Sequence, residues 1–237
     1  MRIAFVYDSI FPYVNGGIER RIYEFALRLT RSGHEVHIFG PKFWDGPDVI
    51  MQNGSYLHGV CSPGTRVVNG KRSVLAPIKF ALRVFFPLLR GKFDIIECPI
   101  FPYFPAYTSR LVSLIRRTPF VVSWFEIWEN FWYEYLGWRG IFGKFIERNA
   151  IRLPHEIVVE TEETAKSLVS WGFNRDHITS IPSGCPTHEY ARLPASNTAQ
   201  DKTDIIFTGR LVDYKRVDLI IDAGSRAYSW VGQPLGI

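Results

Sequence analysis

Short apolar runs alternate with stretches of helical periodicity along residues 3–182, and this alternation constrains the fold more than any other feature of the chain. The predicted strands are 3–7, 36–39, 94–97, 120–124, 156–159 and 178–182, with 57–61 and 66–68 forming either a third strand or a hairpin. The predicted helices are 18–29, 74–90, 107–116, 141–151 and 161–171. Strands that alternate with helices pair in parallel. The pattern therefore predicts an α/β domain, a Rossmann-like parallel sheet with helices on both faces.

A second strand–turn–helix pattern begins after residue 204. Residues 205–208 are apolar, Gly209 marks a turn, and apolar residues return at helical spacing over 217–223. Such a turn places backbone N–H groups, a helix N-terminus, Arg210 and Lys215 where a phosphate group can bind. The plainer interpretation is that both cations only solvate the start of a helix.

These two patterns set the predicted domain organisation. Residues 1–190 form the first domain, 191–203 lack periodicity and are predicted to be a linker, and 204–237 form the start of a second, Rossmann-like unit. We expect this second unit to be incomplete, because the 33 residues from Ile205 to Ile237 are too few to build such a domain.

Composition excludes several classes of protein. With 237 residues, 46% of them hydrophobic, the chain can bury a sizeable core. The net charge of +5 suits nucleic acid, anionic lipid or phosphorylated ligands equally well. Its basic residues are dispersed and form no nucleic-acid motif, so no nucleic-acid partner is expected.

The remaining composition signals concern location and metals. No uncharged apolar stretch approaches the roughly 18 residues that span a bilayer, and the apolar run at the N-terminus is too short for an export signal. Three cysteines without short paired spacing indicate a reducing, cytoplasmic setting. His34 and His37 should point to opposite faces of a strand, and no other metal spacing is present, so no metal site is predicted.

The first loop carries adjacent glycines, Gly16 and Gly17, between the end of a strand and the start of a helix. Ligands favour that edge of a parallel sheet, and glycines let a ligand approach the backbone. The dinucleotide fingerprint Gly-x-Gly-x-x-Gly is absent, which disfavours a dehydrogenase. A purely structural turn stays open at this point.

Aromatic and acidic residues gather after the strand 120–124. Trp124, Phe125, Glu126 and Glu129 lie in or beside the following loop, and aromatic faces flanked by carboxylates suit a sugar-binding cleft. The alternative is a partly buried aromatic cluster with solvated acids. Two carboxylates also raise the possibility of a glycosidase acid and nucleophile, but nothing else in the chain supports hydrolysis.

The helix predicted at Val74–Arg90 is amphipathic and basic. Its cations lie among large apolar residues, a pattern typical of helices that contact anionic lipid. An ordinary helix that covers the sheet, with cations extending past apolar neighbours, explains the same pattern.

Several motifs together resemble the retaining family 4 glycosyltransferases. The segment Gly209-Arg210-Leu211 with Lys215, Asp218 and Ala223 is similar to the opening of that family's donor-side domain. The opening of the chain, with Gly16-Gly17 and Gly33-His34-Glu35-Val36, resembles its acceptor-side domain, and so do Phe93-Asp94-Ile95-Ile96-Glu97 and Ile181-Pro182-Ser183-Gly184.

The resemblance implies a GT-B fold with the second Rossmann-like unit truncated. It also implies transfer of a sugar from a nucleotide-sugar to an acceptor hydroxyl with retention of anomeric configuration. No metal and no cofactor are expected beyond the nucleotide-sugar co-substrate. By this resemblance, Gly16, Gly17, Arg210 and Lys215 contact the donor diphosphate, and Trp124, Phe125, Glu126 and Glu129 lie at the acceptor or sugar cleft.

The resemblance also marks departures from the family pattern. Phe125 stands where a subgroup of the family has a histidine, and a phenyl ring cannot handle protons. The catalytic residues therefore stay unknown. The family's later Glu-x7-Glu carboxylates are absent from the 237 residues, so weak or no transfer is expected from the isolated chain.

Two hypotheses of function follow. The first is a glycosyltransferase of glycan or glycolipid synthesis, with a glycan or lipid-linked acceptor, cytoplasmic and peripheral at the inner membrane face through Val74–Arg90. The alternative is a non-enzymatic acceptor-binding module or subunit that needs a separate donor-domain chain. A third, weaker hypothesis is a fragment with exposed apolar surface at 205–223.

Overall fold

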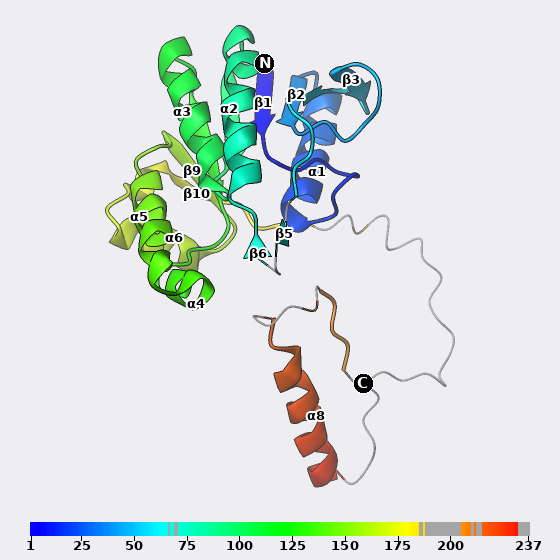
Figure 1. Ribbon diagram of the computed structural model, residues 1–237, viewed down its shortest axis with the longest axis vertical. Helices are drawn as coiled ribbons and strands as arrows, with labels where there is room; N and C mark the ends of the chain where they lie inside the picture. Colours follow the sequence, from blue (N-terminus) through cyan, green and yellow to red (C-terminus); the bar gives the residue numbers. More distant parts are fainter. Residues whose placement is uncertain are drawn as a thin grey trace. The chain divides into compact units, whose positions relative to one another are not determined.

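The computed structural model describes residues 1–65, 67–68, 71–184, 187, 205–209, 211 and 215–231. Contacts divide the chain into two compact units, Met1–Gly184 and Cys185–Ile237. Each unit is described by itself, the first in blue to yellow and the second in orange and red in Figure 1. The predicted linker 191–203 lies outside the described residues.

The first unit alternates strands and helices. Its strands are β1 (Arg2–Val6), β2 (Glu35–Gly40), β3 (Val49–Gln52), β4 (Ser55–Gly59), β5 (Val67–Val68), β6 (Lys71–Arg72), β7 (Ile95–Pro99), β8 (Phe120–Trp124), β9 (Glu156–Val159) and β10 (Ile178–Ser180). Its α-helices are α1 (Gly17–Arg31), α2 (Leu75–Arg90), α3 (Tyr103–Arg116), α4 (Phe131–Leu136), α5 (Gly140–Ala150) and α6 (Glu162–Ser170).

Eight strands form one sheet in the order β10-β9-β8-β7-β1-β2-β4-β3. Every neighbouring pair is parallel except the hairpin of β3 with β4. The predicted α/β architecture is therefore confirmed. Because the chain order reverses direction at β1 and β7, the loops after these strands lie where ligands of such sheets bind.

Alternation along the strands explains why both faces of the sheet are covered. In β1, Ile3 and Phe5 belong to one buried cluster, whereas Ala4 and Val6 belong to the other. Successive side chains of a strand point to opposite faces, so each face receives its own set of apolar residues. Helix α1 packs into the first cluster.

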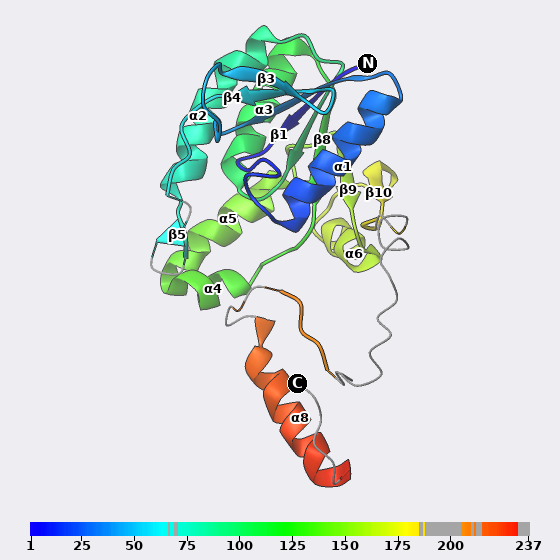
Figure 2. The ribbon, with the colours of Figure 1, turned by 90° about the vertical axis from the view of Figure 1, so that its right-hand side faces the viewer.

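The second and larger cluster receives the other helices. Its buried members include Val84 of α2, Val112 of α3, Ala150 of α5 and Leu168 of α6. In Figure 2, α1 lies on one side of the central strands, and α2 and α3 lie on the other. The helices thus cover both faces, as the sequence predicts.

Three local predictions differ from the structure. Residues 67–68 do not pair with 57–61, because they form the small hairpin β5–β6, and β4 pairs instead with β2 and with β3, a strand that was not predicted. Helix α3 begins at Tyr103 rather than near Tyr107. Its Pro105 obscures the start in the sequence, although a proline in the first turn breaks no intrahelical bond.

The second unit has one described helix, α8 (Val217–Val231), which includes the predicted helical stretch. Residues 205–208, predicted to be a strand, carry no strand assignment. A strand exists through its ladder of hydrogen bonds, and within the described part of this unit no second strand is present to form one.

Candidate functional site

The candidate site lies at the carboxyl ends of the parallel strands in the first unit. The loop 7–16 follows β1, residues 100–102 follow β7, and residues 125–130 follow β8. Since the strands are parallel, these loops meet at one edge of the sheet. Gly16, Gly17, Phe125, Glu126 and Glu129 are all on these loops or at the helix start that follows them.

The glycine pair forms the N-terminus of α1. Gly16 is the N-cap residue in an extended conformation, and no side-chain cap bond is made to it within the described residues. The first intrahelical bond runs from the Arg20 N–H to the Gly16 carbonyl at 3.1 Å, so the three N–H groups before it have no helix carbonyl to bond. The helix dipole adds partial positive charge at the same point.

The space around the two glycines differs. A Cβ on Gly16 would collide with the carboxylate of Glu19, which is buried in the first turn. A Cβ on Gly17 would meet no described atom within 4 Å. Gly17 is thus the open side of the helix start, where an anion can approach the backbone.

One turn along α1, Arg21 connects the helix to two strands. Its guanidinium donates to the Ser123 hydroxyl at 2.9 Å and lies 3.8 Å from the Glu97 carboxylate. The Ser123 hydroxyl also donates to Glu97. All three residues lie on the α1 face of the sheet, and the Arg21 and Glu97 side chains are about 90% buried.

Burial dominates the chemistry of this cluster. It raises the pKa of Glu97, while the Arg21 charge and the Ser123 hydrogen bond oppose the rise. One carboxylate oxygen of Glu97 has no hydrogen-bond partner among the described residues. The Arg21 guanidinium also lies over the Phe125 ring, 5.3 Å from its centroid. Phe125 therefore contacts a cation beside the helix start.

A buried carboxylate holds the loop after β8. Glu147 of α5 is fully buried and accepts four hydrogen bonds, from the Tyr103 hydroxyl, the Trp128 N–H, the Glu129 N–H and the Trp132 indole at 2.8–3.1 Å. Burial beside Glu147 raises the pKa of Tyr103, so its hydroxyl stays a donor. The Glu147 side chain of α5 thus holds the loop 126–130 through its backbone N–H groups.

The four predicted cleft residues lie in different surroundings. Trp124 is fully buried in the core, and its indole donates to the Glu126 carbonyl at 3.0 Å. Its ring cannot face a sugar in this conformation, because no part of the residue is exposed. Phe125 is half-buried and Glu126 is exposed.

Glu129 contacts neighbouring side chains, although its own side chain is 42% exposed. Its carboxylate accepts from the Trp171 indole at 2.9 Å and lies 3.6 Å from Arg148. Its backbone adopts a left-handed conformation with φ of 39°, which the two N–H bonds to Glu147 help to hold. Of the predicted cleft set, Glu126 is therefore exposed at the loop surface, Phe125 and Glu129 are exposed in part, and Trp124 is fully buried.

The predicted donor-side cations lie in the second unit. Lys215 is exposed, two residues before α8 begins. Arg210 lies outside the described residues. Between Lys215 and α8, Arg216 has a φ of 50° and pairs with Asp218 at 2.9 Å, which orients the first turn of the helix.

A shallow hollow opens beside the same loops. It is lined by Asp8, Pro41, Phe43, Cys61, Ser62, Pro63, Gly64 and Ala76. Asp8 is itself buried, and the ring of Phe43 stacks on Tyr13 with centroids 5.8 Å apart. The hollow combines a carboxylate, a hydroxyl and an aromatic surface, which are the groups that recognise a polar organic ligand.

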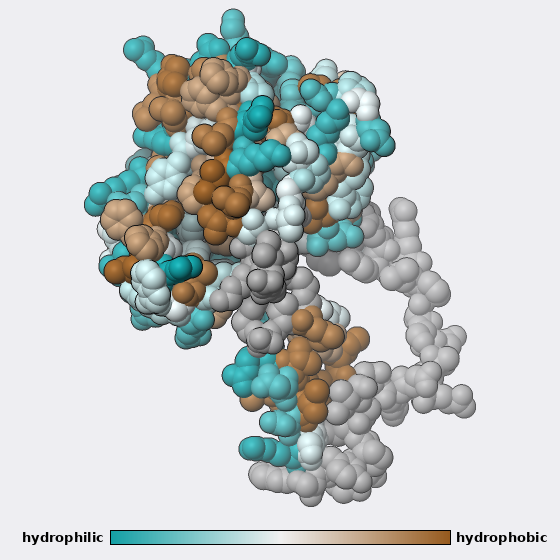
Figure 3. Space-filling view, in the orientation of Figure 1, coloured by the Kyte–Doolittle hydropathy of each residue, from teal (hydrophilic) through white to brown (hydrophobic). Residues whose placement is uncertain are grey.

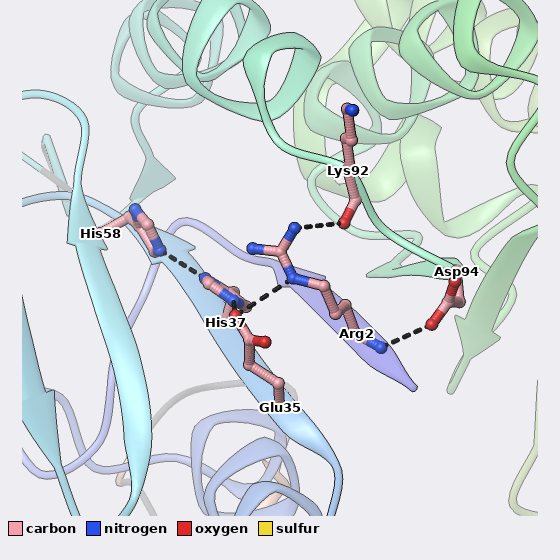
Figure 4. A network of polar contacts seen from close by, with 6 residues as sticks. All are labelled: Arg2, Glu35, His37, His58, Lys92 and Asp94. Atoms are coloured by element: carbon pink, nitrogen blue, oxygen red, sulfur yellow. Dashed lines mark hydrogen bonds and ion pairs between the residues drawn. The ribbon is translucent and has the colours of Figure 1, made fainter.

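A second polar network begins at the amino ends of β1 and β2 and reaches His58, near the carboxyl end of β4 (Figure 4). His37 lies 2.8 Å from both His58 and Glu35, and Arg2 donates to Glu35 at 3.1 Å. If His37 donates its Nε2 proton to Glu35, its Nδ1 must accept from His58. This network joins β1, β2 and β4.

Among the described residues, no group of three or more His, Cys, Asp or Glu side chains could hold a metal ion. None of the described helices is both long and apolar enough to cross a membrane.

Sequence reasoning missed the residues that organise the site. Glu147 has one signal: it lies on the same helical stripe as the buried Gly140, Gly143 and Ala150, where a carboxylate is unexpected. Arg21 has a similar one, since it precedes the buried Ile22 on the sheet-facing side of α1.

Comparison with solved structures identifies the fold. Sucrose-phosphate synthase from Thermosynechococcus elongatus matches with a TM-score of 0.55 and 15% identity over 82% of this chain and 53% of that one. Anabaena HepE in complex with UDP-glucose matches with a TM-score of 0.51 and 16% identity over 80% and 46%. The chain thus spans about half the length of these structures, and the likeness shows the shared Rossmann-like GT-B fold.

A search of curated proteins found no match. The family model described as Glycosyltransferase Family 4 matches residues 15–189, which include α1, the loop after β8 and the Glu147 cluster. This match covers well over half of the 237 residues. The chain therefore belongs to glycosyltransferase family 4.

Proposed function

We propose that this protein transfers a sugar from a nucleotide-sugar to an acceptor hydroxyl with retention of anomeric configuration. Membership of the family supports sugar transfer in general. The open N-terminus of α1 at the carboxyl edge of the sheet is the observation that carries the proposal to this chain.

The donor diphosphate would bind at Gly16 and Gly17. The N–H groups of the first turn, which have no helix carbonyl to bond, and the helix dipole favour a negatively charged ligand. When the sugar leaves, charge develops on the diphosphate, and Arg210 and Lys215 would stabilise it. The HepE match supports this choice of ligand, since that structure holds UDP-glucose.

The acceptor would bind between the loop after β8 and the hollow lined by Asp8, Phe43 and Ser62. Phe125 can stack on an apolar sugar face, and the exposed Glu126 can accept hydrogen bonds from hydroxyls. Glu147 would act indirectly, by holding the loop in place. We place the protein in the cytoplasm, with a glycan or lipid-linked acceptor and contact to the inner membrane face through Val74–Arg90.

A second candidate is an acceptor-binding module that works with a donor-binding half on another chain. One observation favours it: Phe125, where a histidine is expected, packs under the Arg21 guanidinium and offers no proton-handling group. In that case the chain would bind acceptor without turning over a nucleotide-sugar by itself.

The test is an acceptor-dependent transfer assay. The purified chain is incubated with UDP-, GDP- and ADP-sugars and with lipid and glycan extracts, and released nucleoside diphosphate and glycosylated product are measured. The proposal predicts acceptor-dependent release and, by NMR, an unchanged anomeric configuration in the product. Product with inverted configuration contradicts the retaining mechanism. Acceptor binding with no release from any donor supports the module instead.

A further inference from the structure

The outer surfaces of α2, α3 and α5 are unusually apolar. These three helices carry nine large hydrophobic side chains that are at least half exposed: Leu75, Leu82, Phe86, Leu111, Leu114, Ile115, Ile141, Phe142 and Phe145. Helix α3 lies between the other two, since it packs against both. Figure 3 shows the apolar surface over this part of the molecule. We call this surface the α2–α3–α5 face.

The same three helices are almost free of negative charge. Together they contain seven lysines and arginines and a single carboxylate, a net charge of +6, whereas the whole chain has +5. The single carboxylate is Glu147, which is fully buried and bonded inward. The face therefore presents cations without any acid of its own helices.

Helix α1, on the other side of the sheet, provides an internal comparison. It also carries four arginines, but it balances them with Glu19 and Glu24 and has no large hydrophobic residue exposed among its described positions. The combination of exposed apolar residues and unbalanced positive charge is thus a property of one face. It is not a general property of the helices in this fold.

Helix α5 shows that the apolar stripe is held outward. Trp138, Ile141, Phe142 and Phe145 recur at helical spacing, and each is at least 54% exposed. The inner side of α5 is fixed to α4, because Gly140 and Gly143 let it lie against Trp132 with no room for a Cβ. The helix cannot rotate to bury its stripe without losing this contact and the Glu147 bonds.

Cations surround the stripe on α5. Arg139 lies beside Trp138, with its guanidinium 5.5 Å from the ring centroid, and Arg148 and Arg152 are exposed further along. Aromatic and aliphatic residues on one side of a helix, with arginines and lysines beside them, are typical of helices that lie in a membrane interface. Trp and Arg also suit the level of the lipid headgroups.

We propose that the α2–α3–α5 face binds the surface of an anionic lipid membrane. The apolar side chains of all three helices would enter the boundary between headgroups and acyl chains, and the cations would contact the acidic headgroups. The charge favours a membrane over a protein partner, because each of the three helices carries cations beside its exposed apolar residues and none carries an exposed acid. The face extends the contact expected for α2 alone and does not depend on the proposed sugar transfer.

The test is a vesicle sedimentation assay with purified protein. Vesicles of phosphatidylcholine alone are compared with vesicles that contain 30% phosphatidylglycerol. Two double variants change the face. One combines Phe142→Ser with Phe145→Ser, and the other combines Arg83→Gln with Arg90→Gln. Two controls make equal changes elsewhere, Val49→Ser with Met51→Ser on β3, and Arg28→Gln with Arg31→Gln on α1. All positions changed are exposed, and circular dichroism verifies folding.

The proposal predicts binding to anionic vesicles that weakens with salt and is much weaker for neutral vesicles. Loss of two arginines should weaken binding about 25-fold, at roughly fivefold for each cation, and loss of the two phenylalanines at least tenfold. The controls should bind within about twofold of the unchanged protein. Equal binding to both vesicles, or equal losses in the controls, overturns the proposal. The proposal is also overturned if the protein does not bind vesicles and light scattering shows a dimer that dissociates in the Phe142→Ser, Phe145→Ser variant.

Discussion

Replacing Glu147 with glutamine should loosen the loop after β8 and destabilise the first unit by about 3 kcal/mol. Each carboxylate oxygen accepts two of the four hydrogen bonds: Tyr103 and Trp128 bond one oxygen, and Glu129 and Trp132 bond the other. A glutamine keeps one acceptor oxygen, while its NH₂ group faces two former donors.

The magnitude depends on where the amide nitrogen lies. At the first oxygen's position it faces the Tyr103 hydroxyl, which can turn to accept, and the Trp128 N–H, which cannot. At least one buried donor therefore loses its partner, at about 1–3 kcal/mol, and the retained bonds lose the strength that the negative charge gives them. A change of about 3 kcal/mol corresponds to a fall in Tm of about 6–12 °C for a domain of this size.

The assay is equilibrium unfolding in urea, followed by tryptophan fluorescence, to which Trp128 and Trp132 contribute among the seven tryptophans of the chain. Tyr103→Phe removes one donor and should cost about 1 kcal/mol. The double variant should be less destabilised than the sum of the two single variants, because the two side chains share one bond. Glu134→Gln on the exposed side of α4 is the control and should lie within about 0.5 kcal/mol of the unchanged protein. If Glu147→Gln also stays within that range, Glu147 does not hold the loop.

Three further predictions concern other parts of the first unit. Burial lowers the pKa of His58 to about 4, below its ordinary value of 6.5. The free energy of unfolding should therefore be highest above pH 6.5 and fall by about 2 kcal/mol, after allowance for partial exposure, as the pH drops toward 4. Urea unfolding at a series of pH values should show this decrease, His58→Phe should reduce it, and an unchanged decrease in the variant contradicts the assignment. In thermal unfolding, Gly16→Ala should be destabilised by at least about 1 kcal/mol more than Gly17→Ala, because only at residue 16 does a Cβ meet the Glu19 carboxylate. Equal destabilisation of the two variants would show that the Glu19 side chain moves away freely. Arg21→Met should lower the free energy of unfolding by about 3 kcal/mol at pH 7 and by less at pH 5. The reason is that the buried Glu97, whose pKa is already raised, takes up a proton once the cation is gone. A loss of stability that does not depend on pH argues against the Arg21–Glu97 pair.

Two strands with an apolar pattern were predicted to the residue, and the others that were predicted from such a pattern differ by one or two residues at an end. Residues 120–124 and 156–159 are β8 and β9 with the predicted bounds, because both are buried among parallel neighbours and need apolar side chains on each face. In contrast, β3 is an edge strand with alternating exposure, and its four residues give little pattern. Helix α4 is short, and most of its aromatic residues pack against other rings rather than follow a helical stripe.

The candidate site was predictable in position but not in detail. Gly16 and Gly17 lie at the helix start where the sequence pattern puts them, because a strand, a loop and an amphipathic helix in succession leave little freedom. The role of Trp124 could not be read from its neighbours, since an aromatic residue at the end of a strand can face either the loop or the core. Glu147 bonds residues that are 15–44 positions away in the chain, and Arg21 contacts residues that are 76 and 102 positions away, so no local pattern encodes these contacts.

The most direct test of the central claim measures nucleotide-sugar binding to the helix start in the unchanged protein, in Gly17→Ala and in Gly17→Asp. A panel of UDP-, GDP- and ADP-sugars is titrated by calorimetry. An aspartate in the first turn should preserve or slightly raise Tm, because negative charge there complements the helix dipole, yet its carboxylate would repel a diphosphate at the same place. The account predicts saturable binding of at least one donor, changed little by alanine and weakened at least tenfold by aspartate. Absence of binding to every donor, or equal binding by the aspartate variant, would contradict the assignment of this helix start as the donor phosphate site.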